Sequence, residues 1–124
     1  EPNDGYWNDV WNKQPFSASY WGGRPTQDQM YSTAYISTAD WNDTRFKDPK
    51  FDKIIMDARA ELDAAKRKEL YSEAGKMIRD TGGLINPMFS DFISAYRNDK
   101  VTGWVDNPNQ DMMNGLAAVK CWQA

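Results

Sequence analysis

The chain has 124 residues, a formal net charge of −3 and 40% hydrophobic residues, which suits one domain with a core. Its acidity argues against nucleic acid as a partner because phosphate backbones bind basic faces, and no stretch approaches the roughly 18 apolar residues of a membrane span. Histidine is absent, which removes the commonest general base and most zinc sites, so we expect neither an enzyme nor a metal or cofactor site.

The first segment is predicted to be a short helix followed by a strand. Residues 5–13 have the spacing of one apolar helical face, with Asp4 as the N-cap. The face consists of Tyr6, Trp7, Val10 and Trp11. We expect its two tryptophans to lie in the core. Pro15 ends the helix, and residues 16–21 alternate apolar and polar side chains, which is typical of a strand.

The end of this predicted strand is the first candidate binding site. Tyr20 and Trp21 offer ring surfaces for stacking, and Gly22 and Gly23 leave backbone N–H groups open to a ligand. Arg24 adds a permanently charged planar group that suits a carboxylate or a phosphate. The alternative interpretation is a tight glycine turn that carries a solvated surface charge.

A second candidate follows a helix predicted over residues 28–35. The loop of residues 37–50 is polar, so Trp41 within it suggests a pocket wall or a lid. A Trp41 that folds back onto the core is an equally good interpretation. The nearby carboxylates Asp40 and Asp43 admit a hydrolase or metal-site hypothesis, but three-residue spacing in a loop defines no geometry.

The strongest helical signals come next. Asp48 is predicted to cap a helix with Pro49 at its first position, and Asp63 to cap a second helix that ends at Gly82 and Gly83. The apolar stripe of the first helix consists of Phe51, Ile54, Ile55, Ala58 and Leu62. We expect these helices to form an antiparallel or bent pair.

The segment after the helices is predicted to be extended. Residues 83–90 and 91–97 are apolar and β-prone, and residues 100–105 form a third short extended piece. Pro87 cannot occupy a regular position in a central strand. A sheet made of these strands alone exposes its edges, so we interpret the chain as part of a larger domain. Its start at Glu1, without an initiator methionine, agrees with this interpretation.

The helix pair and the segment after it resemble a known family. The stretch from "FDKIIMDARAELDAAKRKELYSEAGKMI" through "GLINPMF" to "VTGW" is similar to the C-terminal lobe of the family 5 extracytoplasmic solute-binding proteins. These are the dipeptide-, oligopeptide- and nickel-binding components of ABC importers. The matching positions are Phe51, Asp52, Ala58, Asp63, Arg67, Leu70, Tyr71, Glu73, Ala74, Ile85, Pro87, Val101 and Gly103. The resemblance runs from about residue 6 to residue 104, and the helix pair is its most specific part.

This resemblance implies an architecture and a cellular setting. The fold expected is α/β, part of lobe II of a type II periplasmic-binding-protein fold with three layers and a mixed sheet, incomplete in this chain. Residues 1–124 would be the C-terminal portion of the second lobe. The N-terminal lobe of the same protein would supply the other half of the ligand cleft. The expected location is the periplasm, and the expected partners are the permease subunits.

The resemblance also bears on Arg24. In the peptide-binding members, a strand ending in tryptophan is followed by two small residues and an aspartate that binds the α-ammonium group of the peptide. Aligned on Trp21, that aspartate position is occupied by Arg24, so the sign of the charge is reversed. Ala18 stands where oligopeptide binders can carry an arginine for the peptide carboxylate. An anionic or polyhydroxylated solute therefore fits better than an ordinary peptide.

The sequence thus predicts the substrate-binding component of an ABC importer, which captures a small solute, peptide-like or anionic and polyhydroxylated, for delivery to a permease. The predicted ligand-binding residues are Tyr20, Trp21, Gly22, Gly23, Arg24 and Trp41. One alternative is a carbohydrate-binding module that uses Trp21 and Trp41 as stacking platforms. A second alternative is a hydrolase that uses Asp40 or Asp43.

Overall fold

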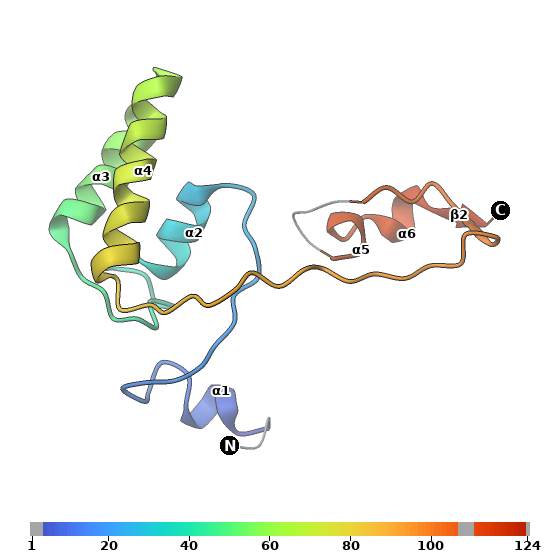
Figure 1. The fold of residues 1–124 in the computed structure, drawn as a ribbon, viewed down its shortest axis with the longest axis horizontal. Coiled ribbons are helices and arrows are strands. Elements are labelled where there is room, and N and C mark those ends of the chain that lie inside the picture. The colour runs from blue at the N-terminus through green and yellow to red at the C-terminus, as the bar shows by residue number, and fades with distance from the viewer. Residues whose placement is uncertain (1–3, 107–110, 124) are drawn as a thin grey trace. The chain divides into compact units, whose positions relative to one another are not determined.

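The structure is a computed structural model that describes residues 4–106 and 111–123. The chain divides into two compact units, the first ending at Ile85 and the second beginning at Asn86. The first unit carries the longer helices, and the second combines short helical turns with a small sheet (Figure 1).

The first helix, α1 (Tyr6–Asp9), is shorter than predicted. Its N-cap is Gly5 and no side chain caps it, so the expected cap at Asp4 is wrong. Turns continue beyond Asp9, but Asn12 adopts a left-handed conformation with φ 56°, which a right-handed helix cannot accommodate. The local backbone therefore ends the helix before Pro15 is reached.

The next three helices begin at capping side chains. These are α2 (Gln27–Ala34), α3 (Pro49–Ala60) and α4 (Ala64–Thr81). Thr26 accepts a hydrogen bond from the backbone of Gln29, and Asp48 and Asp63 each accept from two backbone N–H groups of the helix that they begin. These hydrogen bonds satisfy donors that the first turn of a helix leaves unpaired. The predicted caps at Asp48 and Asp63 are confirmed.

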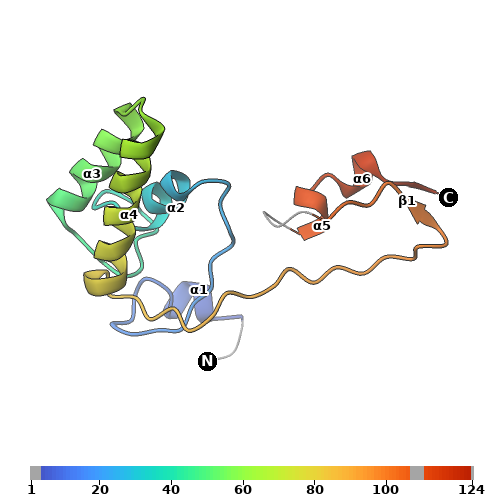
Figure 2. The same ribbon diagram turned by 45° about the horizontal axis from the view of Figure 1, so that its top comes forward.

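The core of the first unit lies where α3 and α4 pack side by side, with α2 against them (Figure 2). Phe51 and Ile55 are its largest fully buried side chains, each worth roughly 2 kcal/mol relative to exposure. The buried cluster is completed by Ala34, Tyr35, Ile54, Ala74 and Ile78. Leu62, which was predicted in the same stripe, lies beyond the end of α3 and is exposed.

A polar network joins the three helices on their solvent side. The guanidinium of Arg59 on α3 donates from Nε to both carboxylate oxygens of Asp28 on α2, at 2.8 and 3.0 Å. Tyr71 on α4 donates its hydroxyl to the same carboxylate at 3.1 Å. Asp28 therefore bonds to α3 and α4 at once, which determines how α2 is placed against the pair.

The predicted three-layer fold with a mixed sheet is wrong for the described residues. Residues 16–21 and 84–97 are extended but join no sheet, and Figure 1 draws the second segment as a plain trace. Within residues 4–106 and 111–123, no backbone hydrogen bond of a turn, loop or ladder involves residues 84–96. A strand needs a neighbour, and the described chain offers these segments none.

The second unit contains the small sheet. Strand β1 (Val101–Thr102) pairs antiparallel with β2 (Trp122–Gln123), with Val101 opposite Gln123. The segments α5 (Asp111–Asn114) and α6 (Ala117–Lys120) precede β2, and α5 is a left-handed turn at its two methionines. Gly103 has φ +86°, and a Cβ there would lie 2.4 Å from the carbonyl oxygen of Lys120, so only glycine fits beside β2.

Candidate functional site

Three tryptophans from distant parts of the sequence meet in the first unit. The ring centroids of Trp11, Trp21 and Trp41 lie 6.2–6.5 Å apart, in edge-to-face or tilted pairs. We call this group the tryptophan triad. Such separations and angles are those of favourable aromatic contacts. The triad therefore joins the turn after α1, the extended segment before α2 and the loop before α3.

The carboxylate of Asp43 accepts hydrogen bonds from two members of the triad. Oδ2 of Asp43 accepts a hydrogen bond from Nε1 of Trp11 at 2.8 Å and another from Nε1 of Trp21 at 3.2 Å. The backbone N–H of Asp43 donates to the carbonyl of Trp41 at 2.9 Å. The partly buried Asp43 is thus bonded to all three members of the triad.

The tryptophan triad is part of a larger group that extends to α1. We call this group the aromatic surface; it consists of the triad, Tyr6, Trp7 and Tyr20. Trp7 packs edge-to-face on Tyr20, with centroids 5.6 Å apart, and on Tyr6 at 5.2 Å. The hydroxyl of Tyr6 donates to the carbonyl of Ala18, which attaches the extended segment to α1. A concavity of about 620 Å³ lies between them. It is lined by Asp4, Tyr6, Trp7, Ala18, Ser19 and Tyr20.

The side chain of Arg24 is folded back over the backbone that precedes it. Its Nη1 donates to the carbonyl oxygens of Gly22 and Gly23, at 2.9 and 3.2 Å, and its guanidinium carbon lies 6.0 Å from the centroid of Trp21. This is the distance of a cation–π contact. Among the described residues, Nε and Nη2 of Arg24 make no hydrogen bond, so one edge of the guanidinium keeps its donors.

Gly22 and Gly23 do not form the tight turn that the sequence suggested. Neither has a positive φ, and a Cβ on Gly22 would meet Nη1 of Arg24 at an ordinary 3.7 Å. Their carbonyl oxygens, rather than the N–H groups that the sequence suggested for a ligand, take part in the local structure as acceptors from Arg24. The approach of Arg24 to the main chain therefore does not require a glycine at position 22.

The six predicted binding residues fall into one region. Trp21 and Trp41 touch, Arg24 covers Trp21, and Tyr20 packs on Trp7. Tyr20 is 77% exposed and Trp41 is 52% exposed, so both present ring surface to solvent. The concavity reaches Tyr20 but is not lined by residues 21–24.

Sequence reasoning missed two residues of this region and one beside it. Trp7 and Trp11 were both expected in the core, which is wrong, because Trp7 is 46% exposed and Trp11 is only partly buried. Asp43 was considered only as a catalytic or metal-binding acid. Asn42, which is buried, donates from Nδ2 to three carbonyls of the same loop, those of Tyr35, Ile36 and Phe46. The available signal was the sequence of residues 40–43, in which polar residues flank a tryptophan. It could not reveal the partners of Asp43, because the hydrogen bond from Trp11 to Asp43 spans 32 residues.

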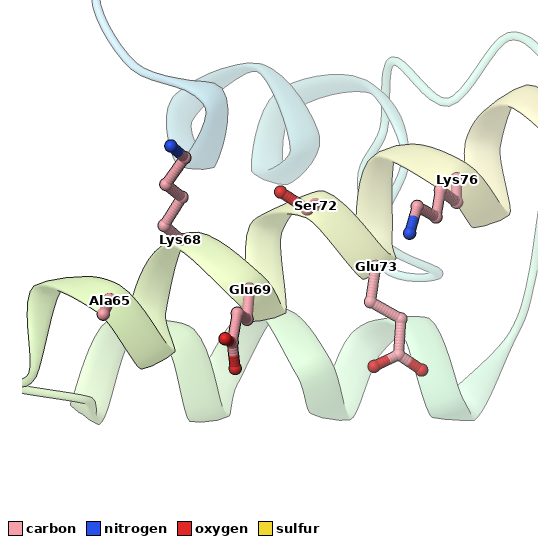
Figure 3. Close-up of a pocket in the computed structure, with 6 residues that line it drawn as sticks. All are labelled: Ala65, Lys68, Glu69, Ser72, Glu73 and Lys76. Carbon is pink, nitrogen blue, oxygen red and sulfur yellow. The ribbon is translucent and has the colours of Figure 1, made fainter.

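A second concavity, of about 590 Å³, runs along the exposed face of α4 (Figure 3). Its side chains are of mixed charge, and Glu69 and Glu73 project to the same side of the helix. Glu73 pairs with Lys50 of α3 at 2.7 Å, which raises the pKa of that lysine. With opposite charges and no aromatic wall, this is an ordinary solvated helix face.

Two further properties of the described residues bear on function. No group of three or more cysteine, aspartate or glutamate side chains within residues 4–106 and 111–123 is arranged to hold a metal ion. In the same part of the chain, no helix combines the length and the apolar character that crossing a bilayer requires.

Comparison with known proteins leaves the resemblance to solute-binding proteins as a prediction. No protein-family model, no curated protein and no solved structure matches the chain.

Proposed function

We propose that this chain is part of the substrate-binding component of an ABC importer. It would capture a small solute in the periplasm and deliver it to the permease subunits, without chemical turnover. The observation that carries the proposal is the aromatic surface. Tyr20 and Trp21 of the first candidate site lie in one region with Trp41 of the second, and the rings of Tyr20 and Trp41 are at least half exposed.

The chemistry of this surface favours an anionic or polyhydroxylated solute. Exposed tyrosine and tryptophan rings stack on the C–H faces of sugars and similar molecules. The free edge of the Arg24 guanidinium suits a carboxylate, because its remaining donors lie in one plane. A ligand that stacks on Tyr20 or Trp41 and presents an acid to Arg24 would use both features.

Two other observations support a role as one part of a larger binding protein. The helix pair α3 and α4, with the predicted caps Asp48 and Asp63, is the part of the chain whose resemblance to the solute-binding family is most specific. The apolar segment of residues 84–97 is extended and exposed, as expected of a segment that another part of the same protein covers. We propose that the N-terminal lobe of the protein provides this cover and the other half of the cleft.

The test is native mass spectrometry of the full-length protein purified from its own host, followed by identification of any retained small molecule. We expect one equivalent of an acidic or polyhydroxylated solute, which the variant Arg24→Ala binds at least tenfold more weakly, because a charge-assisted bidentate pair is worth about 1.5–3 kcal/mol. Arg79→Ala, which removes an exposed guanidinium on α4, is the matched control and should retain the solute. A retained cationic peptide, or turnover of the solute, would contradict the proposal.

The carbohydrate-binding module remains a second candidate because Trp41 and Tyr20 are exposed as platforms. The two functions differ in what each needs. A carbohydrate module should bind neutral glycans as the 124-residue chain alone, and Arg24→Ala should leave this binding unchanged. An importer component should require the rest of the protein and should depend on Arg24.

A further inference from the structure

Asp43 uses a single carboxylate oxygen for two indole donors. Trp11 and Trp21 both donate to Oδ2, at 2.8 and 3.2 Å, although they lie 32 and 22 residues away in the sequence. Hydrogen bonds to a carboxylate are stronger and shorter than neutral ones. The pair of bonds therefore constrains the direction in which the indole N–H of each ring points.

The loop holds Asp43 itself in place. Its backbone N–H donates to Trp41, and its neighbour Asn42 is buried with three carbonyls around Nδ2. Thr44 donates its hydroxyl to Oδ1 of Asn42 and accepts from the backbone of Phe46. The carboxylate thus projects from a loop whose own hydrogen bonds are satisfied, which suits a positioning role.

We infer that Asp43 is the positioning residue of the aromatic surface, the group that holds Trp11 and Trp21 in the orientation in which they support Trp41. The part of this inference that concerns a ligand rests on the proposed function. Because both indole N–H groups donate to Asp43, Trp11 and Trp21 offer a solute their carbon faces and no hydrogen-bond donor. Polar recognition then falls to Arg24 and to the backbone, and the tryptophans select for an apolar or C–H face.

The experiment compares three variants with the wild-type protein. Asp43→Ala removes the acceptor, whereas Asp43→Asn removes the charge and keeps one oxygen that can accept both indole bonds. Asp40→Ala is the matched control, because this exposed acid of the same loop contributes only its backbone carbonyl to the described hydrogen bonds. The readouts are the indole N–H signals in a ¹H–¹⁵N correlation spectrum and the near-ultraviolet circular dichroism of the coupled tryptophans.

In the wild type we expect downfield, slowly exchanging indole signals from Trp11 and Trp21. The indole of Trp104, which donates to the exposed Asp106 in the second unit, gives a separate signal that none of the variants should move. Asp43→Ala should lose both signals and part of the near-ultraviolet dichroism, Asp43→Asn should retain both signals but move them upfield because a neutral oxygen is a weaker acceptor, and Asp40→Ala should match the wild type. If Asp43→Ala fails to fold, Asp43→Asn still decides, because two indole signals that stay at their wild-type positions in that variant would overturn the role of the acceptor. Unchanged signals in a folded Asp43→Ala would also overturn the inference.

The ligand is not needed for these measurements, so they separate this inference from the proposed function. Native mass spectrometry of full-length Asp43→Ala adds the functional readout, with loss of the retained solute expected. A wild-type protein that retains no solute would count against the proposed function, while the indole signals would still decide the role of Asp43.

Discussion

Asn42 shows how one buried polar residue organises a loop that the sequence marks only as irregular. Its side-chain nitrogen Nδ2 donates to three backbone carbonyls within residues 35–46, and its side-chain oxygen Oδ1 accepts from the hydroxyl of Thr44. Buried polar atoms without partners are costly, so this arrangement makes the side chain hard to replace. The loop in turn carries Trp41 and Asp43 to the aromatic surface.

Substituting this residue should therefore destabilise the first unit. Asn42→Ala leaves carbonyls unpaired and is expected to lower the free energy of unfolding by about 2–3 kcal/mol, measured by urea denaturation. Asp40→Ala, an exposed position in the same loop, should change it by less than about 0.5 kcal/mol. Equal effects of the two substitutions would show that Asn42 has no special role.

At the scale of elements, local signals predicted the helices well and the strands badly. Caps at Asp48 and Asp63 involve hydrogen bonds over two or three residues, so the sequence contains all that they need. A strand depends on a neighbour that can lie anywhere. Residues 84–97 have none among the described residues, whereas the predicted extended piece at residues 100–105 contains β1, which pairs with β2. The meeting of Trp11 with Trp21 and Asp43 was out of reach for the same reason.

The packing of α2 against α4 gives a reason for a glycine within a long helix. Glycine in a helix interior costs about 1 kcal/mol relative to alanine, yet a Cβ at Gly75 would lie only 3.0 Å from the hydroxyl oxygen of Tyr31. Gly75→Ala should therefore fail to stabilise the protein. In a Tyr31→Phe background, where that oxygen is absent, the same substitution should stabilise it by about 0.5–1 kcal/mol.

A thermal double-mutant cycle measures this coupling between Gly75 and Tyr31. The contact predicts that the two substitutions are not additive. Additive effects would show that Tyr31 moves aside without cost.

For the whole molecule, the tyrosines of the first unit predict a loss of stability in alkali. Burial raises the pKa of Tyr35, and the negative charge of Asp43 and the proximity of Tyr31 raise it further. Burial also raises the pKa of Tyr31 and of Tyr71. The folded protein keeps protons that the unfolded chain loses above about pH 10, so unfolding releases protons there.

Stability should thus be full below about pH 10 and fall as the pH rises through the folded-state values. Denaturation midpoints between pH 8 and 11.5 measure this fall, and Tyr35→Phe should make the profile flatter. Asp43→Asn should shift the absorbance titration of the tyrosines toward lower pH, whereas Asp40→Asn should shift it less. A profile that Tyr35→Phe leaves unchanged would exclude Tyr35 as a source.

The extended apolar segment has a consequence for how the chain is handled in the laboratory and in the cell. Phe89 and Ile93 are each 91% exposed, and an extended backbone with large side chains is the form in which proteases bind substrates. Chymotrypsin should cut the 124-residue chain at the exposed Phe89, as well as at the exposed Phe16, before it cuts at the buried Phe51. A longer protein whose remaining part covers this segment should resist the same digestion, so the rate of nicking would report whether that cover is in place.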